Sequence, residues 1–417
     1  MDVLWEMQPP KAAYVHVPFC RRRCFYCDFP ISVVGDRLIG ESSGMMAEYV
    51  AWLIREIDLE PAKGEGLSSI FFGGGTPSLL SPGQISQILI TLEQRFGFES
   101  GIEISMEVDP GTFDLPRLNS WRSAGVNRFS LGVQAFQDEL LEACGRSHRM
   151  KDVERSVELL RSTGNWSLDL MSGLPGQTLS MWLESLELAI DTGSTHLSVY
   201  DLTVEPGTVF GKLSDRNCLN VPLEEEVVEM YRMTAERLSA VGFDRYEVSS
   251  YARSVEFECQ HNRVYWSGLP FYGFGMGATS FVDGVRLGRP RTRAEYFDWV
   301  GENEKKTVQD SMIAQNNLDQ NNFAQNDLAQ SNLEKREREI FLERVMMGLR
   351  LVKGIEVDPL IRRFGMALVD EAIAALQPFV ISGLVVIEAG WVRLSEPEGL
   401  LLSNVVLVGL FEAIDRE

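Results

Sequence analysis

The chain has little positive charge for its length and no long apolar run. Among its 417 residues, 39 Lys and Arg stand against 60 Asp and Glu, which gives a formal net charge of −21 at pH 7. Broad nucleic-acid surfaces neutralise phosphates with Lys and Arg, so we expect no nucleic-acid partner. A membrane helix needs ~20 apolar residues. The nearest run, 400–411, is shorter and contains Ser403 and Asn404, so we expect no integral membrane segment.

Cysteine is also scarce. The chain has six cysteines, and three of them are scattered, at Cys144, Cys218 and Cys259. This distribution does not resemble the disulfide framework of a small secreted protein. The N-terminal residues are acidic and show no basic, apolar leader. We therefore expect a cytoplasmic protein in a reducing compartment.

The other three cysteines, Cys20, Cys24 and Cys27, lie in one short loop after a strand-like run. Thiolates are soft ligands and commonly hold iron–sulfur clusters. With three ligands, a cluster of four irons keeps one iron open to a small molecule. Zinc is the main alternative, but a structural zinc site needs four ligands and no second ligand pair follows. A loop with incidental thiols is the other alternative, and the spacing favours the open cluster.

Strand-like and helix-like runs alternate between residues 13 and 241. The strand-like runs are 13–17, 69–72, 102–108, 127–133, 166–171 and 196–202, and the helix-like runs are 45–59, 82–96, 115–124, 151–162, 181–191 and 223–241. Such alternation predicts βαβ units around a parallel sheet. Six units make an α/β fold, a partial (β/α)6 version of the eight-fold TIM barrel. In such folds the functional residues lie at the C-terminal ends of the strands.

Polar residues and glycines follow the predicted strands at that end. The cysteine loop follows the first strand and the run 73–77, Gly-Gly-Gly-Thr-Pro, follows the second. Glycines let backbone N–H groups approach an anion, although such a run alone is usually only a tight turn. Any single polar residue here could equally be a satisfied surface group. Their convergence on one rim favours a binding site.

These motifs together resemble the radical S-adenosylmethionine (radical SAM) superfamily. The stretches 16–20, 27–29, 132–136 and 169–178 are similar to its oxygen-independent coproporphyrinogen III oxidase family and close relatives. The resemblance implies a [4Fe–4S] cluster on Cys20, Cys24 and Cys27 whose open iron binds S-adenosyl-L-methionine (AdoMet), the cofactor that carries the chemistry. It further implies that AdoMet lies among Tyr14, Tyr26, Gly75, Thr76, Glu107, Gln134, Arg146, Asp169 and Thr203.

Two features separate the chain from the true oxidases. Those carry a further cysteine where this chain has Phe29, and a longer extension than the 13 residues that precede Tyr14. The pattern His-Asn-x-x-Tyr-Trp instead resembles HemW-type haem chaperones. That resemblance implies haem as cargo and haem-accepting apoproteins as partners. It places the haem against His261, Asn262, Tyr265 and Trp266, since imidazole is a common axial ligand and aromatic rings suit a porphyrin.

Alternatives stay open at this point. His261 and Asn262 could stitch a loop, with Tyr265 and Trp266 in the core, and Cys259 is a second candidate for contact with haem. Coproporphyrinogen III oxidase is the alternative function, and a radical SAM enzyme acting on another small molecule or RNA is a third. The sequence does not decide whether AdoMet is cleaved, or whether the chain forms a homodimer.

We expect four parts. These are a radical SAM partial barrel over 1–250, a barrel-associated segment with the His-Asn-x-x-Tyr-Trp pattern over 251–309, an Asn/Gln-rich linker over 310–333, and a small winged-helix-like α+β domain over 334–417. The linker repeats on a period of five residues, too few times to form a solenoid core. The segment 367–372 is acidic, so a docking role for the last domain is favoured over DNA binding.

Two further patterns have two interpretations each. The basic spots 21–23 and 286–291 are interpreted as solvated surface, with recognition of ligand carboxylates as the alternative. The glycine-rich stretch 268–278 allows either close backbone approach to a ligand or simple turns beside a strand.

Overall fold

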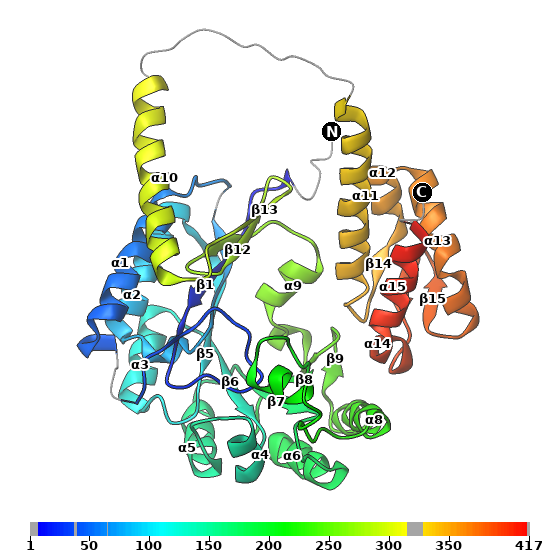
Figure 1. Ribbon diagram of the computed structural model, residues 1–417, viewed down its shortest axis with the longest axis horizontal. Coiled ribbons are helices and arrows are strands. Elements are labelled where there is room, and N and C mark those ends of the chain that lie inside the picture. The colour runs from blue at the N-terminus through cyan, green and yellow to red at the C-terminus, as the bar shows by residue number, and fades with distance from the viewer. Residues whose placement is uncertain (1–6, 37–39, 65, 315–327, 415–417) are drawn as a thin grey trace.

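A parallel sheet wrapped by helices forms the larger part of the structure (Figure 1). The computed structural model describes residues 7–36, 40–64, 66–314 and 328–414. Within these residues the main sheet has nine strands in the order β11-β1-β4-β5-β6-β7-β8-β10-β9. Their bounds are β1 (Ala12–Val17), β4 (Leu67–Gly74), β5 (Phe98–Val108), β6 (Arg128–Gln134), β7 (Trp166–Ser172), β8 (His196–Asp201), β9 (Asp244–Arg245), β10 (Ser250–Ala252) and β11 (Tyr272–Phe274).

The six predicted strands are β1 and β4 to β8, and they pair in parallel in chain order. Three strands that the sequence did not predict extend the sheet. β11 adds in parallel beside β1, while β10 and β9 add antiparallel beyond β8. The α/β class and the partial (β/α)6 barrel are therefore confirmed, with a sheet wider than six strands.

Helices pack around this sheet. They are α1 (Gly44–Leu59), α2 (Pro82–Phe96), α3 (Leu115–Ala124), α4 (Asp138–Ala143), α5 (Met150–Leu160), α6 (Leu179–Asp191), α7 (Val209–Ser214), α8 (Glu224–Ala240), α9 (Gln260–Trp266) and α10 (Arg293–Ala314). Local sequence fixes many of their ends. In α2, Ser81 and Gln84 form a reciprocal capping box, Pro82 starts the helix and Gly97 ends it. The core between the helices and the sheet contains almost fully buried side chains such as Phe72, Trp121 and Trp166.

Short two-stranded pairs and single turns complete this part. The pairs are β2 (Phe19–Cys20) with β3 (Ser32–Val33), and β12 (Thr279–Val282) with β13 (Val285–Gly288), while the 3-10 turns lie at Gly40–Ser42, Pro77–Leu79 and Val255–Phe257. Within the described part of the chain, no helix combines the length and apolar character needed to cross a membrane.

The C-terminal region forms a smaller unit with its own core. Its helices are α11 (Leu328–Gly348), α12 (Val357–Phe364), α13 (Met366–Ile381), α14 (Glu398–Leu401) and α15 (Ser403–Ile414), and its strands are β14 (Ile355–Glu356), β15 (Val385–Glu388) and β16 (Trp391–Leu394). The predicted helices and the two wing strands are present. Of the predicted linker 310–333, residues 315–327 lie outside the described residues. Its two ends are helical, because α10 continues to Ala314 and α11 begins at Leu328.

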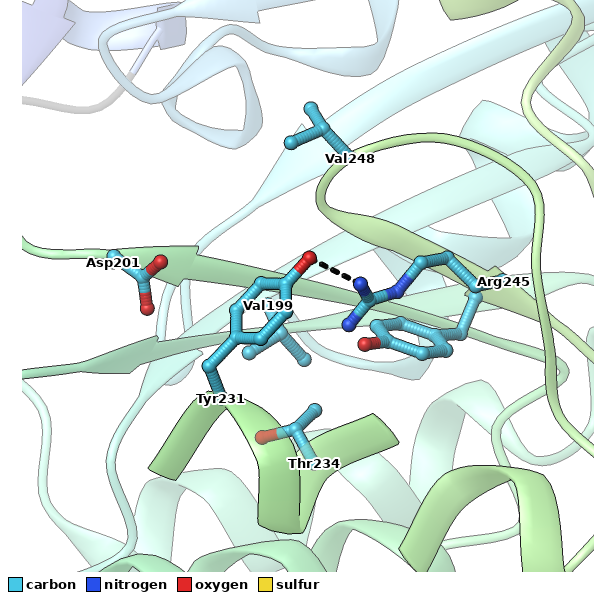
Figure 2. Close-up of a pocket in the computed structure, with 7 residues that line it drawn as sticks. Val199, Asp201, Tyr231, Thr234, Arg245 and Val248 are labelled. Carbon is cyan, nitrogen blue, oxygen red and sulfur yellow. Dashed lines mark hydrogen bonds between the residues drawn. The ribbon is translucent and has the colours of Figure 1, made fainter. Parts of the chain in front are cut away.

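Arg245 of β9 joins the barrel to this C-terminal unit. Its guanidinium lies over the rings of Tyr231 and Tyr251, 4.4 and 4.6 Å from their centroids. It also donates a hydrogen bond to the Tyr231 hydroxyl (Figure 2). Its Nε lies 3.6 Å from Oε1 of Glu396 in the C-terminal unit. The adjoining cavity of about 10 Å³ is large enough for one water molecule. Main-chain hydrogen bonds between 246–248 and 350–352 strengthen the same junction.

Candidate functional site

A cavity of about 440 Å³ opens where the parallel strands end. Its walls come from the cysteine loop, the last residues of β4 to β8, and the segment that follows β8. Parallel strands present their C-terminal ends at one edge, so residues far apart in sequence meet there. The residues that line it include Cys20, Cys24, Tyr26, Cys27, Gly75, Thr76, Glu107, Asp109, Gln134, Arg146, Asp169, Met171, Tyr200 and Thr203.

The three cysteines are free thiols, partly buried, on one wall of this cavity. The Cys27 N–H donates to the Cys24 carbonyl at 3.2 Å, which folds the loop into a turn. The Arg23 guanidinium secures the end of this loop by donating to the Cys27 carbonyl at 3.1 Å and the Phe29 carbonyl at 3.0 Å. Burial raises the pKa of Cys20 to about 12 and also raises the pKa of Cys27. These thiols therefore stay protonated until a metal displaces the proton.

Side chains from two other connecting segments reach the thiols. Arg146 Nη1 donates to Cys24 Sγ at 3.4 Å, and Thr76 Oγ1 lies 3.7 Å from Cys20 Sγ. Across the residues that the structure covers, no three His, Cys, Asp or Glu side chains are grouped so that they could hold one metal ion. An iron–sulfur cluster places its cysteines on different irons, so it does not require such convergence. Three thiols on one loop beside a cation suit a cluster better than a closed zinc site.

Two partly buried carboxyl groups also line the cavity. Glu107 accepts a hydrogen bond from the Gly74 N–H at 3.1 Å, and Asp169 accepts from Ser130 Oγ at 3.0 and 3.1 Å. Burial, together with the charge of Asp169, raises the pKa of Glu107 to about 8. Burial also raises the pKa of Asp169. A cationic ligand group would favour the charged form of both side chains.

Arg146 is fixed by a partner that the sequence did not single out. Its Nη2 donates to Asp109 Oδ1 and to the Gly132 carbonyl, both at 2.7 Å. Asp109 lies two residues after Glu107, so strand alternation could have placed both on the same face. A guanidinium held in this way suits a carboxylate ligand.

Gln134 has an unusual backbone and an unpaired amide oxygen. Its φ is +69°, a left-handed value that is uncommon for residues other than glycine. Among the described residues, its buried Oε1 has no hydrogen-bond partner. A buried acceptor without a donor is costly, so this oxygen favours a ligand that carries a hydroxyl or amino group.

Tyr14 is the one predicted AdoMet residue that does not line the cavity. It lies deeper in the barrel, where its hydroxyl is 3.1 Å from His16 Nδ1 and its ring stacks on Phe71 at 6.3 Å. The glycine run also serves packing within the protein. A Cβ at Gly74 would lie 2.3 Å from the His16 ring, and the φ of +107° there also requires glycine.

The pattern His-Asn-x-x-Tyr-Trp forms α9, away from the cavity. His261 is only 1% exposed, and its ring stacks on Phe71 at 5.4 Å. Its Nδ1 lies 3.1 Å from Ser69 Oγ and its Nε2 lies 2.7 Å from the Tyr265 hydroxyl. Burial lowers the pKa of His261 to about 3. Asn262, Tyr265 and Trp266 are partly exposed, and none of these four residues lines the cavity of the cysteines.

A carboxylate from β5 anchors the start of α9. Glu103 accepts hydrogen bonds from the N–H groups of Gln260 at 3.0 Å and His261 at 3.2 Å. Cys259 Sγ lies 3.6 Å from the same carboxylate, and burial raises its pKa to about 12. Cys259 is therefore as inaccessible as His261 in this conformation.

The glycine-rich stretch 268–278 lies behind the cysteine loop. A Cβ at Gly275 would lie 2.5 Å from the Tyr49 hydroxyl, and one at Gly277 would lie 2.2 Å from Pro30 Cγ. The close approach that these glycines permit is therefore to the protein itself. Through Pro30, the stretch supports the loop that carries the three cysteines.

Comparison with known proteins agrees with this geometry. The Radical SAM superfamily profile matches residues 14–189, and the HemN C-terminal domain profile matches residues 336–402. The heme chaperone HemW of Synechocystis sp. is 41% identical over 428 aligned residues, which cover 98% of each chain. The chain belongs to the HemW family of heme chaperones. The HemW of Bacillus subtilis is 34% identical and covers 95% of this chain and 98% of its own.

The radical SAM core and the HemW family that the sequence predicted are thus confirmed. A solved structure of coproporphyrinogen III oxidase (HemN) from Escherichia coli superposes with a TM-score of 0.76 over 97% of this chain and 90% of its own. At 22% identity this likeness shows the fold alone. Membership of the HemW family therefore places the chain with the heme chaperones and not with the coproporphyrinogen III oxidases.

Proposed function

We propose that the protein binds haem and transfers it to apoproteins that require haem, with a [4Fe–4S] cluster and AdoMet held in its core. The observation that carries the proposal is the likeness to HemW heme chaperones along 98% of the chain. The cysteine loop on a cavity of about 440 Å³ supports the cofactor part, because cavities of ~300–1,000 Å³ hold small ligands.

Cys20, Cys24 and Cys27 would hold the cluster. The residues proposed to hold AdoMet are Tyr26, Gly75, Thr76, Glu107, Gln134, Arg146, Asp169 and Thr203, while Tyr14 would act from beneath the cavity floor. When bound together, the two cofactors supply one-electron chemistry.

The chain's own groups would orient AdoMet. Arg146 offers a guanidinium held by Asp109, and Gln134 offers a buried acceptor. Burial, and for Glu107 also the charge of Asp169, raises the pKa of each carboxyl group. A cationic ligand would offset this effect and favour the charged form of both groups. Burial of these groups also strengthens their electrostatic interactions with the ligand.

We keep His261, Asn262, Tyr265 and Trp266 as proposed haem contacts from the sequence pattern. The structure attaches a condition to this proposal. For His261 to bind iron, α9 must move so that the buried ring becomes accessible and one of its ring nitrogens loses its hydrogen-bond partner. Cys259 would need the same movement, because it is 1% exposed.

The proposed partners are haem and haem-accepting apoproteins, and a homodimer remains a proposal. A net charge of −21 supports the absence of nucleic-acid partners. A reducing, cytoplasmic location is proposed because free thiols and an open cluster persist in reducing compartments. We also propose that the chain divides into four parts, with boundaries after residues 250, 309 and 333. The second part, 251–309, contributes β11 to the main sheet.

A transfer assay tests the function. The untagged protein is reconstituted anaerobically, titrated with haemin, freed of unbound haemin and mixed with an apoprotein acceptor such as apomyoglobin. We expect saturable binding near one haem per chain and transfer faster than from a haemin–albumin complex. Absence of saturable binding would remove the chaperone proposal.

Coproporphyrinogen III oxidase is the second candidate, supported by the fold of the HemN structure. Conversion of coproporphyrinogen III to protoporphyrinogen IX, followed by liquid chromatography, would establish it. We expect no conversion. Phe29, 53% exposed, occupies the position where the resemblance places the additional cysteine of the oxidases.

A further inference from the structure

All four histidines of the chain are withdrawn from solvent. His16, His148, His196 and His261 are 4%, 2%, 1% and 1% exposed. In each of the four rings, both nitrogens have a polar partner within 3.5 Å. The partners are Tyr14 and Pro30 for His16, Arg146 and Val133 for His148, Ser167 and Tyr246 for His196, and Ser69 and Tyr265 for His261. In this conformation an iron porphyrin meets no available imidazole.

The two basic spots of the sequence meet beside Asp28 and Phe29, which line the rim of the cysteine cavity. Arg23 donates to the Phe29 carbonyl at 3.0 Å, and Arg291 Nη2 donates to the Asp28 carbonyl at 2.8 Å. Both cations therefore lie against the short segment that follows Cys27. In a chain with a net charge of −21, this concentration of arginine is a local exception.

The rim also presents a flat apolar group. Phe29 is 53% exposed and lines the cavity, together with Ile31 and with Arg22. The Arg22 side chain is 62% exposed and lies 3.6 Å from Asp36, so this ion pair is weak. We call Arg22, Arg23, Phe29 and Arg291 the arginine rim.

We propose that haem docks on the arginine rim, with its propionates toward the guanidinium groups and one face against Phe29. Haem is a flat apolar ring with two carboxylates at one edge. Guanidinium groups pair with carboxylates and aromatic rings stack on flat apolar surfaces, so the rim complements both parts. The inference rests on the proposed chaperone function, and it names the entry site of the cargo in the closed protein.

Phe29 and Arg291 are exposed, so their replacement tests the inference without disturbing the core. We compare Phe29→Ala and Arg291→Glu with two controls on distant exposed positions, Ile381→Ala on α13 and Arg122→Glu at the end of α3. Each untagged variant is reconstituted anaerobically, and cluster absorbance and the AdoMet-induced change in the cluster's electron paramagnetic resonance spectrum check its core. Dissociation constants are measured for haemin and for haemin dimethyl ester, which lacks the propionate charges.

We expect Phe29→Ala and Arg291→Glu each to weaken haemin binding about tenfold, the effect of one charge-assisted or stacking contact. The controls should bind haemin like the unaltered protein. The dimethyl ester should bind the unaltered protein about tenfold more weakly than haemin, and Arg291→Glu should not weaken it further. The optical and resonance Raman spectra of haem at this entry site should show no imidazole ligand, because ligation by His261 requires a movement of α9.

Two results would overturn the inference while the chaperone function stands. One is saturable haemin binding that rim variants leave unchanged, and the other is a spectrum of an imidazole-ligated iron. Failure of the unaltered protein to bind either porphyrin would instead remove the proposed function.

Discussion

The buried ion pair of Glu56 on α1 with Arg289 should contribute strongly to the stability of the barrel. Arg289 is fully buried and Glu56 is 3% exposed, with Arg289 Nε 2.7 Å from Glu56 Oε1. The second carboxylate oxygen accepts from the Gly275 N–H at 2.7 Å and the Tyr296 hydroxyl at 2.6 Å. The pair therefore ties α1 and α10 to the glycine-rich turn that supports the cysteine loop.

Replacement of Arg289 by Met leaves a buried carboxylate with two donors and no opposite charge. Breaking such a pair costs about 3–5 kcal/mol of unfolding free energy. Because the hydrogen bonds to Gly275 and Tyr296 remain, we expect a loss of about 3 kcal/mol, at the lower end of that range. Adding Glu56→Gln removes the isolated charge, so the double variant should regain part of the loss.

Urea denaturation of the cluster-free protein, followed by far-ultraviolet circular dichroism, measures these differences. Arg232→Met is the matched control, because its pair with Glu398 is 48% and 44% exposed. Such a surface pair contributes about 0–1 kcal/mol. A loss below about 1 kcal/mol for Arg289→Met, or a double variant no more stable than the single one, would refute the reasoning.

Three further predictions concern the site. Gly277→Ala would place a Cβ 2.2 Å from Pro30 Cγ, at a φ of +76°, and so disturb the loop that carries the cysteines. Iron and sulfide assays should therefore show lower cluster occupancy. Gly288→Ala is the control, because its Cβ would lie 3.7 Å from the nearest atom, and it should match the unaltered protein. Burial raises the pKa of Glu107 from 4.5 to about 8, so the folded state binds more protons than the unfolded state between these values. The contribution of Glu107 to the unfolding free energy should therefore fall as pH rises from 4.5 to about 8, so the difference in unfolding free energy between the unaltered protein and Glu107→Gln should fall over this range. A difference that does not change with pH would contradict the raised pKa. Cys24→Ala should lose cluster absorbance and slow haem transfer while haem still binds; transfer at the unaltered rate would contradict a role for the cluster in delivery.

The sequence predicted those elements of the fold that have a local signal. The six central strands and their long helices have clear periodicity, and the cysteine loop is contiguous. The helices α4 and α7 have six residues each, too few for a periodic signal. The place of β11 beside β1 depends on pairing across more than 250 residues, as Ala13 pairs with Tyr272, which no local pattern contains.

The same limit applies to the site. Most predicted AdoMet residues meet in one cavity because they lie near the C-terminal ends of parallel strands or in the connections that follow them, a rule that can be applied to a sequence. The burial of His261 could not be predicted, since it depends on Ser69 and Phe71 in a distant strand. The meeting of Arg23 and Arg291 at one loop likewise required the tertiary structure.

The inaccessibility of the four imidazoles has a practical consequence for purified protein. The chain offers no exposed histidine to an immobilised nickel resin, so affinity purification needs an added polyhistidine sequence. Imidazole is also a common axial ligand of haem iron, and such a tag would present several in solvent. A haem spectrum with histidine ligation, recorded on tagged protein, would therefore report on the tag until it is repeated after proteolytic removal.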